Sequence, residues 1–173
     1  AILHAREQGL ASLVIVPEIA LTPQLVDRFK ARLGSKIAVL HSAMSARERW
    51  SYWQAIINNE VDVVIGARSG IFAPIPNLGL IVVDEEHDTS YKQEDMGNYH
   101  ARDMAILRAS IEKIPVVLAS ATPSEETLEN VANGKYRGLK LNSRFGGATL
   151  PKIETIDLRE HHPESYRTSN DEK

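Results

Sequence analysis

Three features are missing from this sequence of 173 residues. It has no cysteine, which excludes disulfides and thiolate metal sites. No apolar run reaches the roughly 18 residues that a membrane-spanning helix needs. There is no excess of basic residues either, because the formal net charge is -3. That charge argues against a surface that is basic throughout, although a few arginines and backbone amides can still contact phosphates. The remaining composition, 43% hydrophobic and 25% charged, is typical of a globular domain.

Short apolar runs alternate with amphipathic stretches along the chain. Runs that are apolar on both faces are typical of strands buried in a parallel sheet, and they lie at 12–16, 37–40, 61–65, 80–83 and 116–119. The amphipathic stretches predict helices at 22–33, 45–58, 100–112 and 124–133, with a further helix in residues 1–9. This alternation predicts an α/β fold with a mainly parallel sheet and helices on both faces.

Local patterns mark the ends of the predicted helices. Thr22-Pro23 and Thr122-Pro123 each place an N-cap hydroxyl before a proline at the first helical position. Ser45-Ala46-Arg47-Glu48 has the capping-box pattern. Asn133-Gly134 is typical of a helix stop. These signals agree with the helix boundaries that the apolar periodicity predicts.

The strongest chemical signal is the run Leu80–Val83 followed by Asp84 and Glu85. Two carboxylates leave a buried strand at its C-terminal end, where open α/β sheets bind ligands. In nucleotide hydrolysis such a first carboxylate holds Mg²⁺ and the second polarises the attacking water. An acidic loop after an ordinary strand is the alternative, and His87 alone is more typical of a surface histidine.

Three further strand ends carry polar groups. Ser120-Ala121-Thr122 follows the strand at 116–119, where small hydroxyl residues can hydrogen-bond a neighbouring acidic loop or simply cap a helix. Thr22 and Gln24 begin a helix whose free amides can bind a phosphate. Arg68 and Ser69 lie between glycines, so the backbone can approach a ligand while the arginine pairs with a phosphate. Each of these could also be an ordinary turn.

Taken in order, the four strand ends resemble motifs Ia, Ib, II and III of superfamily 2 helicases, with Asp84-Glu85-Glu86-His87 as the DExH box and Ser120-Ala121-Thr122 as the Ser-Ala-Thr motif. Together with Tyr91-Lys92-Gln93 and Tyr99-His100-Ala101-Arg102-Asp103, they resemble the PriA family of bacterial replication-restart helicases over residues 1–160. The resemblance implies an incomplete RecA-like, three-layer domain of the P-loop NTPase type. It also implies a 3′→5′ DNA helicase that uses ATP and Mg²⁺ in replication restart and primosome assembly.

The resemblance also implies residue roles. Asp84 would serve magnesium, Glu85 would activate water, and His87 would link the nucleotide site to DNA, with Ser120 and Thr122 coupling the two. The contacts to DNA would come from motifs Ia and Ib and from the loop at 88–102, through Thr22, Gln24, Arg68, Ser69, Tyr91, Lys92, Tyr99 and Arg102. The two tyrosines could stack on bases of any sequence, or pack the loop against its own domain. Lys92 and Arg102 could meet phosphates or acidic neighbours.

The phosphate loop G-x-x-x-x-G-K-[ST] of such enzymes is absent from the sequence. We therefore expect an inactive fragment: residues 1–150 as the first motor domain without its phosphate-loop strand, and 151–173 as an exit segment. Because that strand normally lies inside the sheet, we expect a gap beside the acidic strand. Zn²⁺ would belong only to the longer parent, outside this chain.

The family resemblance implies further expectations: single-stranded and forked DNA, single-stranded-DNA-binding protein and primosome proteins as partners, no membrane, and a cytoplasmic, nucleoid-associated location. Two alternatives stay open. One is a non-enzymatic DNA- or partner-binding module that kept the fold, and the other is a different superfamily 2 translocase.

Overall fold

The computed structural model describes residues 1–34, 36–93 and 97–142. The chain divides into two units, Ala1–Tyr136 and Arg137–Lys173, and the fold below is that of the first. The predicted exit segment 151–173 and the predicted domain end at 150 lie outside the described residues, so both stay predictions.

Five parallel strands form the central sheet in the order β2-β3-β1-β4-β7. They run over Ala11–Ile15 (β1), Ile37–Leu40 (β2), Val63–Gly66 (β3), Leu78–Val83 (β4) and Val116–Leu118 (β7). Every strand predicted from an apolar run is therefore present, with ends shifted by a few residues at most. β1 and β3 are buried along their whole length, as strands covered on both faces should be.

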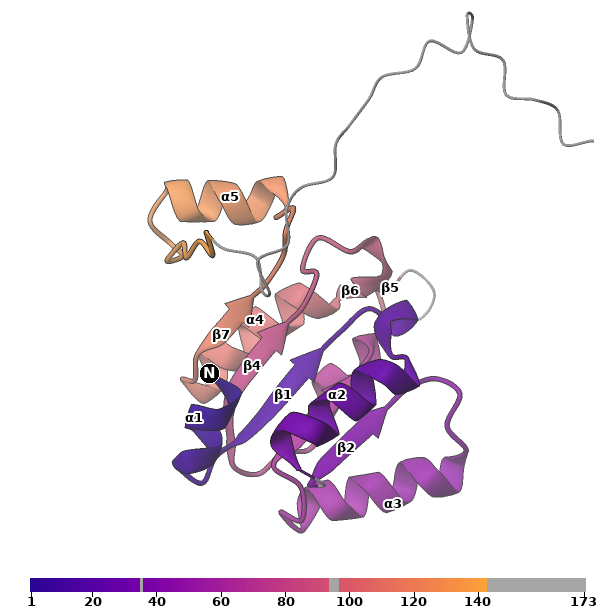
Figure 1. Cartoon of the computed structure of the whole chain (residues 1–173). Coiled ribbons are helices and arrows are strands. Elements are labelled where there is room, and N and C mark those ends of the chain that lie inside the picture. Colours follow the sequence, from indigo (N-terminus) through magenta and orange to yellow (C-terminus); the bar gives the residue numbers. More distant parts are fainter. Residues whose placement is uncertain (35, 94–96, 143–173) are drawn as a thin grey trace, which may run out of the picture. The chain divides into compact units, whose positions relative to one another are not determined.

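Helices cover both faces of the sheet, as predicted (Figure 1). They span Ile2–Glu7 (α1), Pro23–Leu33 (α2), Ala46–Ile57 (α3), Ala101–Glu112 (α4) and Glu125–Ala132 (α5). Side chains of α3 and α4 pack into one apolar cluster with one face of the sheet, and those of α1 and α2 pack into a second cluster on the opposite face. This is the three-layer α/β arrangement that the alternating sequence pattern predicts.

The acidic strand β4 is paired on both sides, with β1 and with β7. The expected gap beside it is therefore absent, and that prediction was wrong. In the described part of the chain, the edges of the sheet are β2 and β7, and the three residues of β7 are all partly or fully accessible. The order of strands in space decides which strands lie at the edges, and hydrophobic patterns along a sequence do not encode that order.

Two of the three predicted helix caps form as expected. The Thr22 hydroxyl accepts a hydrogen bond from the amide of Leu25 at the start of α2, and Ser45 forms a complete capping box with Glu48. The cap of α5 is Ser124 rather than Thr122. The amide of Ser124 is bound by a buried carboxylate described below, which fixes the point at which the helix begins.

The loop at 88–102 contains three short elements: a 3₁₀ turn at Thr89–Tyr91 and a two-stranded antiparallel hairpin of Lys92–Gln93 (β5) with Tyr99–His100 (β6). Two other 3₁₀ turns follow strands, at Glu18–Ala20 after β1 and at Arg68–Phe72 after β3. Among the residues singled out in the sequence, these short elements hold Arg68, Ser69, Tyr91, Lys92 and Tyr99.

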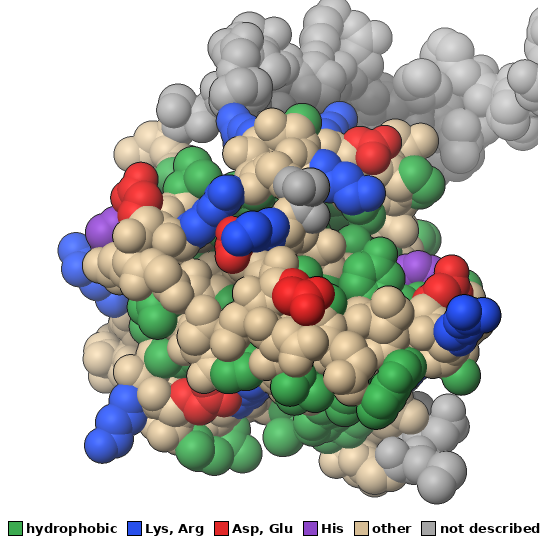
Figure 2. Space-filling model, turned by 90° about the horizontal axis from the view of Figure 1, so that it is seen from below, with side chains coloured by type: hydrophobic (Ala, Val, Ile, Leu, Met, Phe, Trp, Pro, Cys, Tyr) green, Lys and Arg blue, Asp and Glu red, His purple; other side chains and the backbone are tan. Residues whose placement is uncertain are grey.

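On the side opposite to these loops, Lys and Arg side chains lie near Asp and Glu side chains, and hydrophobic side chains form patches on the same face (Figure 2). Charges of both signs are thus mixed on this side, in keeping with the net charge of -3. Among the described residues, no helix has the length and apolar character needed to cross a membrane.

Candidate functional site

The ends of three neighbouring strands are joined by backbone hydrogen bonds at the acidic motif. The amide of Asp84 donates to the carbonyl of Ile15 at the end of β1, over 2.9 Å. The amide of Glu86 donates to the carbonyl of Ala119, just after β7, over 3.0 Å. The motif is therefore held at the C-terminal edge of the sheet, where the sequence predicted it.

Asp84 and Glu85 present their carboxylates outward. Asp84 is exposed and Glu85 is half-exposed, and one carboxylate oxygen of Asp84 accepts the amide of Glu85. Glu85 has a φ of 45°, in the left-handed region that residues with a side chain rarely adopt. Such strain persists where the surroundings over-determine the backbone, and it is common at functional sites. Here the strand-end hydrogen bonds of the two flanking residues supply that constraint.

His87 connects the acidic motif to the Ser-Ala-Thr segment. Its Nδ1 lies 2.7 Å from the hydroxyl oxygen of Ser120 and 3.6 Å from a carboxylate oxygen of Glu85. The same hydroxyl oxygen accepts the amide of Thr122 over 2.9 Å. The structure thus brings Glu85, His87 and Ser120 together, which is the contact between acidic and hydroxyl segments that the sequence allowed.

Glu86 points the other way and is buried, with 1% of its surface exposed. Its carboxylate accepts the amide of Ser124 over 2.6 Å and the hydroxyl of Thr127 over 3.0 Å. It also forms an ion pair with Arg102, whose Nη1 lies 3.2 Å away. The group of Glu86, Arg102, Ser124 and Thr127, called here the Glu86 cluster, joins the acidic motif to the first turns of α4 and α5.

Opposing effects act on the charges of this cluster. Burial by itself would raise the pKa of Glu86, but the hydrogen bonds from Ser124, Thr127 and Arg102 outweigh it and lower that pKa below its ordinary value. Burial would likewise lower the pKa of Arg102, but hydrogen bonds to Asp103 and Glu86 outweigh it and raise that pKa. Both groups are therefore charged at neutral pH, and the arginine is engaged with acidic neighbours rather than available to a phosphate.

Tyr91 lies in the core with none of its surface exposed. Its hydroxyl donates toward the carbonyls of Ile15, over 3.2 Å, and Asp84, over 2.5 Å. Burial, followed by the nearby charges of Asp84, Asp88 and Glu85, raises the pKa of Tyr91. The ring has no free face for a base, so the packing alternative left open in the sequence describes this residue.

The hairpin of β5 and β6 is tied to the turn after β3. Arg68 donates through Nη1 to the carbonyl of Lys92 over 2.8 Å and to that of Ser90 over 3.2 Å. The ring of Phe72 packs edge-on against Tyr99, with centroids 5.2 Å apart. Arg68 therefore acts on the hairpin backbone, a role that its sequence position did not predict.

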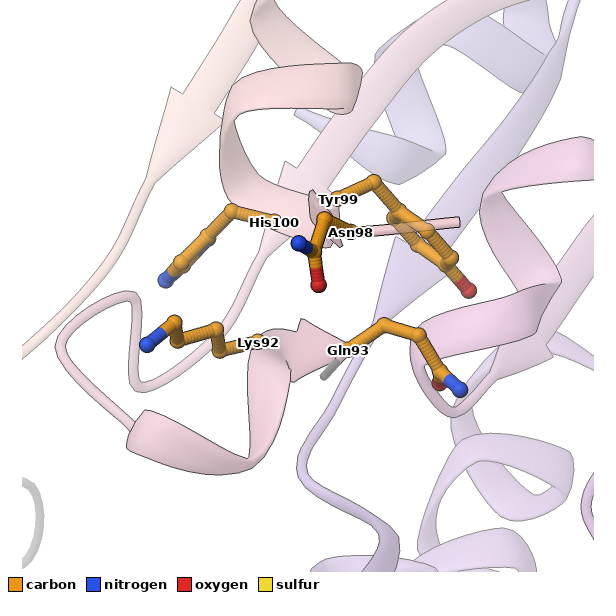
Figure 3. A pocket seen from close by; sticks show the side chains of 5 residues that line it. All are labelled: Lys92, Gln93, Asn98, Tyr99 and His100. Atoms are coloured by element: carbon orange, nitrogen blue, oxygen red, sulfur yellow. The ribbon is translucent and has the colours of Figure 1, made fainter. Parts of the chain in front are cut away.

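The hairpin borders a pocket of about 510 Å³ (Figure 3). Tyr99 and Gln93 lie on one side of it, Lys92 and His100 on the other, and Asn98 between them. Burial lowers the pKa of His100, so this ring is neutral at neutral pH. Of the two tyrosines proposed from the sequence to contact bases, the pocket contains Tyr99 and the core contains Tyr91.

Thr22 and Gln24 are exposed at the start of α2. Within the described residues, neither side chain hydrogen-bonds the acidic motif. Ser69 is exposed as well and lines a second pocket, beside Phe72. The structure therefore gathers the predicted site residues into two groups, one around Glu85 and one around the hairpin, and leaves the start of α2 outside both.

Comparison with known proteins identifies the fold and its motif. Residues 1–131 match the DEAD/DEAH box helicase family. The chain belongs to the DEAD/DEAH box helicase family. The acidic motif Asp84-Glu85-Glu86-His87 lies within the matched residues and differs from the letters Asp-Glu-Ala-His of the family name only at Glu86.

Individual proteins of known name are more similar to the chain than the family match alone indicates. The chain is 49% identical over 153 residues to the replication restart protein PriA of Bacillus subtilis, a match that covers 88% of this chain and 19% of that protein. It is 48% identical over 157 residues to the PriA of Synechocystis, with the same coverage. The likeness to PriA predicted from the motifs is confirmed. The chain spans about a fifth of the length of these relatives.

Among solved structures, the C-terminal part of the Fun30 ATPase domain is similar, with a TM-score of 0.46 and 14% identity over 80% of this chain and 43% of that one.

The Glu86 cluster is the part of this DEAD/DEAH box site that the sequence did not reveal. One signal was present: a third acidic residue inside the box, at a position where the strand-end backbone turns inward. Its partners Arg102 and Ser124 lie 16 and 38 residues further along the chain, so no local pattern connects them.

Proposed function

We propose that this chain supplies the acidic half of the ATP site of an ATP-dependent, 3′→5′ DNA helicase that acts in replication restart. The observation that carries the proposal is the pair of outward carboxylates, Asp84 and Glu85, on the strained turn at the end of β4. The contact between His87 and Ser120 joins this pair to the next strand of the sheet. Membership of the DEAD/DEAH box helicase family supports it.

The residues fit a magnesium-bound nucleotide. Mg²⁺ prefers one or two carboxylates and keeps several waters beside the nucleotide phosphates, and Asp84 and Glu85 offer that set. Among the described residues, no group of three His, Asp or Glu side chains forms a full metal cage, which suits an ion shared with phosphates. Bound ATP would supply the phosphoryl group that is transferred to water, with ADP as the leaving group, and Mg²⁺ would supply positive charge that polarises that group.

The chain's own residues would do the rest. Asp84 would hold the ion through its exposed carboxylate, while Glu85 would orient the attacking water and accept its proton. His87 lies between Glu85 and Ser120. A movement of Ser120, after β7, would therefore shift His87 and with it the carboxylate of Glu85. The buried hydroxyl of Tyr91 would hold the backbone carbonyl of Asp84 in a fixed position during these steps.

The same edge would contact single-stranded DNA through Tyr99, Lys92 and Ser69, with the start of α2 at Thr22 and Gln24 as a further contact. Arg68 would contribute by holding the hairpin that carries Tyr99 and Lys92. The proposal extends to forked DNA, single-stranded-DNA-binding protein and primosome proteins as partners, near the bacterial nucleoid in the cytoplasm. It rests on the likeness to PriA, whose curated name is "Replication restart protein".

The test uses the Bacillus subtilis relative with its matching segment replaced by this chain. In that chimera, Glu85→Gln should abolish DNA-stimulated ATP hydrolysis while ATP binding persists, because the amide keeps the shape but cannot accept a proton. Wild-type turnover in the variant would show that Glu85 is not the base. Glu48→Gln, an exposed glutamate on α3, is the matched control and should leave hydrolysis unchanged.

For the chain alone we expect no ATP hydrolysis, because its sequence lacks the phosphate loop G-x-x-x-x-G-K-[ST], whose lysine binds the nucleotide phosphates. Magnesium-dependent turnover by the purified chain that disappears in Glu85→Gln would refute this expectation and favour a complete site.

A further inference from the structure

A second pocket, of about 190 Å³, lies between α3 and the turn after β3. Its walls include the rings of Trp53 and Phe72 and the side chain of Met44, and its polar groups are His41, Arg49 and Ser69. We call it the Trp53 pocket. It lies at the same C-terminal edge of the sheet as the acidic motif, because Leu40, the last residue of β2, and residues of the turn after β3 line it.

The Trp53 pocket and the hairpin pocket are neighbours with a shared wall. Phe72 lines the first and Tyr99 lines the second, and the two rings contact each other edge to face at 5.2 Å. The turn Arg68–Phe72 serves both: its first residue binds the hairpin backbone, and its last residue lines the Trp53 pocket. In this ring pair, Phe72 therefore faces the Trp53 pocket and Tyr99 faces the hairpin pocket.

The charge of the two linings differs from that of the whole chain. The described residues that line the two pockets include the cations Arg49 and Lys92 and no aspartate or glutamate. The chain as a whole carries 23 acidic residues against 20 basic ones. An occupant with an apolar, planar part and a negative charge is complementary to such a lining.

We propose that the Trp53 pocket accepts one base of single-stranded DNA, next to a base held at Tyr99, with the Phe72–Tyr99 pair between them. This inference rests on the proposed DNA contact and adds a binding position and its residues to it. Trp53 and Phe72 would stack on the base regardless of its identity, and Arg49 would meet the adjoining phosphate. An apolar side chain of a partner protein would leave Arg49 without a counter-charge, which makes it the less favoured occupant.

The experiment uses the two tryptophans of the chain, Trp50 and Trp53. Trp50 is 65% exposed on α3, so Trp50→Phe leaves Trp53 as the single fluorophore without disturbing the core. Adding oligo(dT) at low salt should quench the fluorescence of Trp53. The reciprocal variant Trp53→Phe leaves Trp50 as the fluorophore, and here we expect little quenching. Equal quenching of both would indicate contact with exposed rings in general and would overturn the proposal.

Affinity is measured in parallel by anisotropy of labelled oligo(dT). Phe72→Leu keeps an apolar side chain but removes the π face, and we expect about a fivefold to tenfold weaker affinity. Ile111→Ala, an exposed position on α4, is the control and should bind as the wild type does. A series of oligonucleotides carries a single abasic site, placed at a different position in each. For the wild type, we expect the abasic site to weaken affinity at two adjacent positions. For Phe72→Leu, we expect it to weaken affinity at only one position.

The outcomes separate the two levels of the proposal. Oligo(dT) binding with unquenched Trp53 and unchanged affinity in Phe72→Leu would overturn the Trp53 pocket while the DNA role of this edge stands. Failure of the chain to bind oligo(dT) at all would overturn both. Circular dichroism of each variant confirms that a lost signal is not lost folding.

Discussion

Glu85 and Glu86 are neighbours of the same chemical type in opposite environments. Glu85 is half-exposed on a left-handed turn and makes one contact with His87. Glu86 is buried and is bound by three other side chains and one backbone amide. The turn at Glu85 separates the two side chains, so that one faces solvent at the strand ends and the other faces α4 and α5.

The difference between Glu85 and Glu86 shows that adjacent residues of one short motif can meet opposite physical requirements. A carboxylate that activates water needs an open side and a proton to accept. A carboxylate that holds two helices in place needs burial and a full set of donors. In this chain the proposed water-activating role and the structural role fall on the consecutive residues Glu85 and Glu86. The buried contacts of Glu86 hold the backbone from which Glu85 projects. Removing each side chain in turn should therefore have different consequences.

The largest effect is expected for Glu86→Ala. It leaves Arg102 and the donors of Ser124 and Thr127 without their buried acceptor, and breaking a buried ion pair costs about 3–5 kcal/mol of the free energy of unfolding. Urea denaturation followed by circular dichroism measures it. Glu85→Ala is the matched control and should change the free energy of unfolding by less than about 0.5 kcal/mol. Equal losses in the two variants would contradict the division between a structural and a reactive glutamate.

A smaller effect is expected for the two tyrosines of the loop. Tyr91→Phe keeps the buried ring but removes the hydroxyl shared by the carbonyls of Ile15 and Asp84. The carbonyl of Ile15 keeps its hydrogen bond from the amide of Asp84, but the carbonyl of Asp84 loses this donor. Leaving that carbonyl without the hydroxyl should lower the free energy of unfolding by about 1–3 kcal/mol. Tyr99→Phe, on the accessible hairpin, should lower it by less than about 0.5 kcal/mol. A larger loss for Tyr99→Phe than for Tyr91→Phe would reverse our assignment of the buried ring.

The smallest effect is expected in the pH dependence of stability, because burial and hydrogen bonds move the pKa of Glu86 in opposite directions. The net pKa in the folded state lies below the ordinary value of 4.5. The carboxylate therefore stabilises the fold fully above pH 4.5, and this stabilisation is lost as the pH falls through the folded pKa.

The measurement compares urea denaturation of the wild type and Glu86→Gln from pH 7 to pH 3. The advantage of the wild type should shrink as the pH falls below 4.5. The pKa of Asp88 is also lowered, by hydrogen bonds from Ser90, but this residue is present in both proteins and cancels in the difference. A difference that stays constant across the range would show that the charge of Glu86 does not stabilise the fold.

Much of the fold could be predicted because its signals are local. Apolar runs located all five strands of the sheet, and amphipathic periods with caps such as Ser45 located the helices. The acidic pair and the Ser-Ala-Thr segment were recognisable for the same reason, since each is a few consecutive residues after a strand. The cap of α5 was missed because Ser124, rather than Thr122, is bound by a residue 38 positions away.

The sequence by itself determined the α/β class, the carboxylates at the end of β4, and the kinship with the DEAD/DEAH box helicases and PriA. These depend on residue type and spacing within single segments. Only the tertiary structure decided that β4 is paired on both sides, that Tyr91 is a core residue, and that Glu86 belongs to a buried cluster. Those facts depend on contacts between segments far apart in the chain, where burial and hydrogen-bond partners, rather than the residue's own chemistry, set its role.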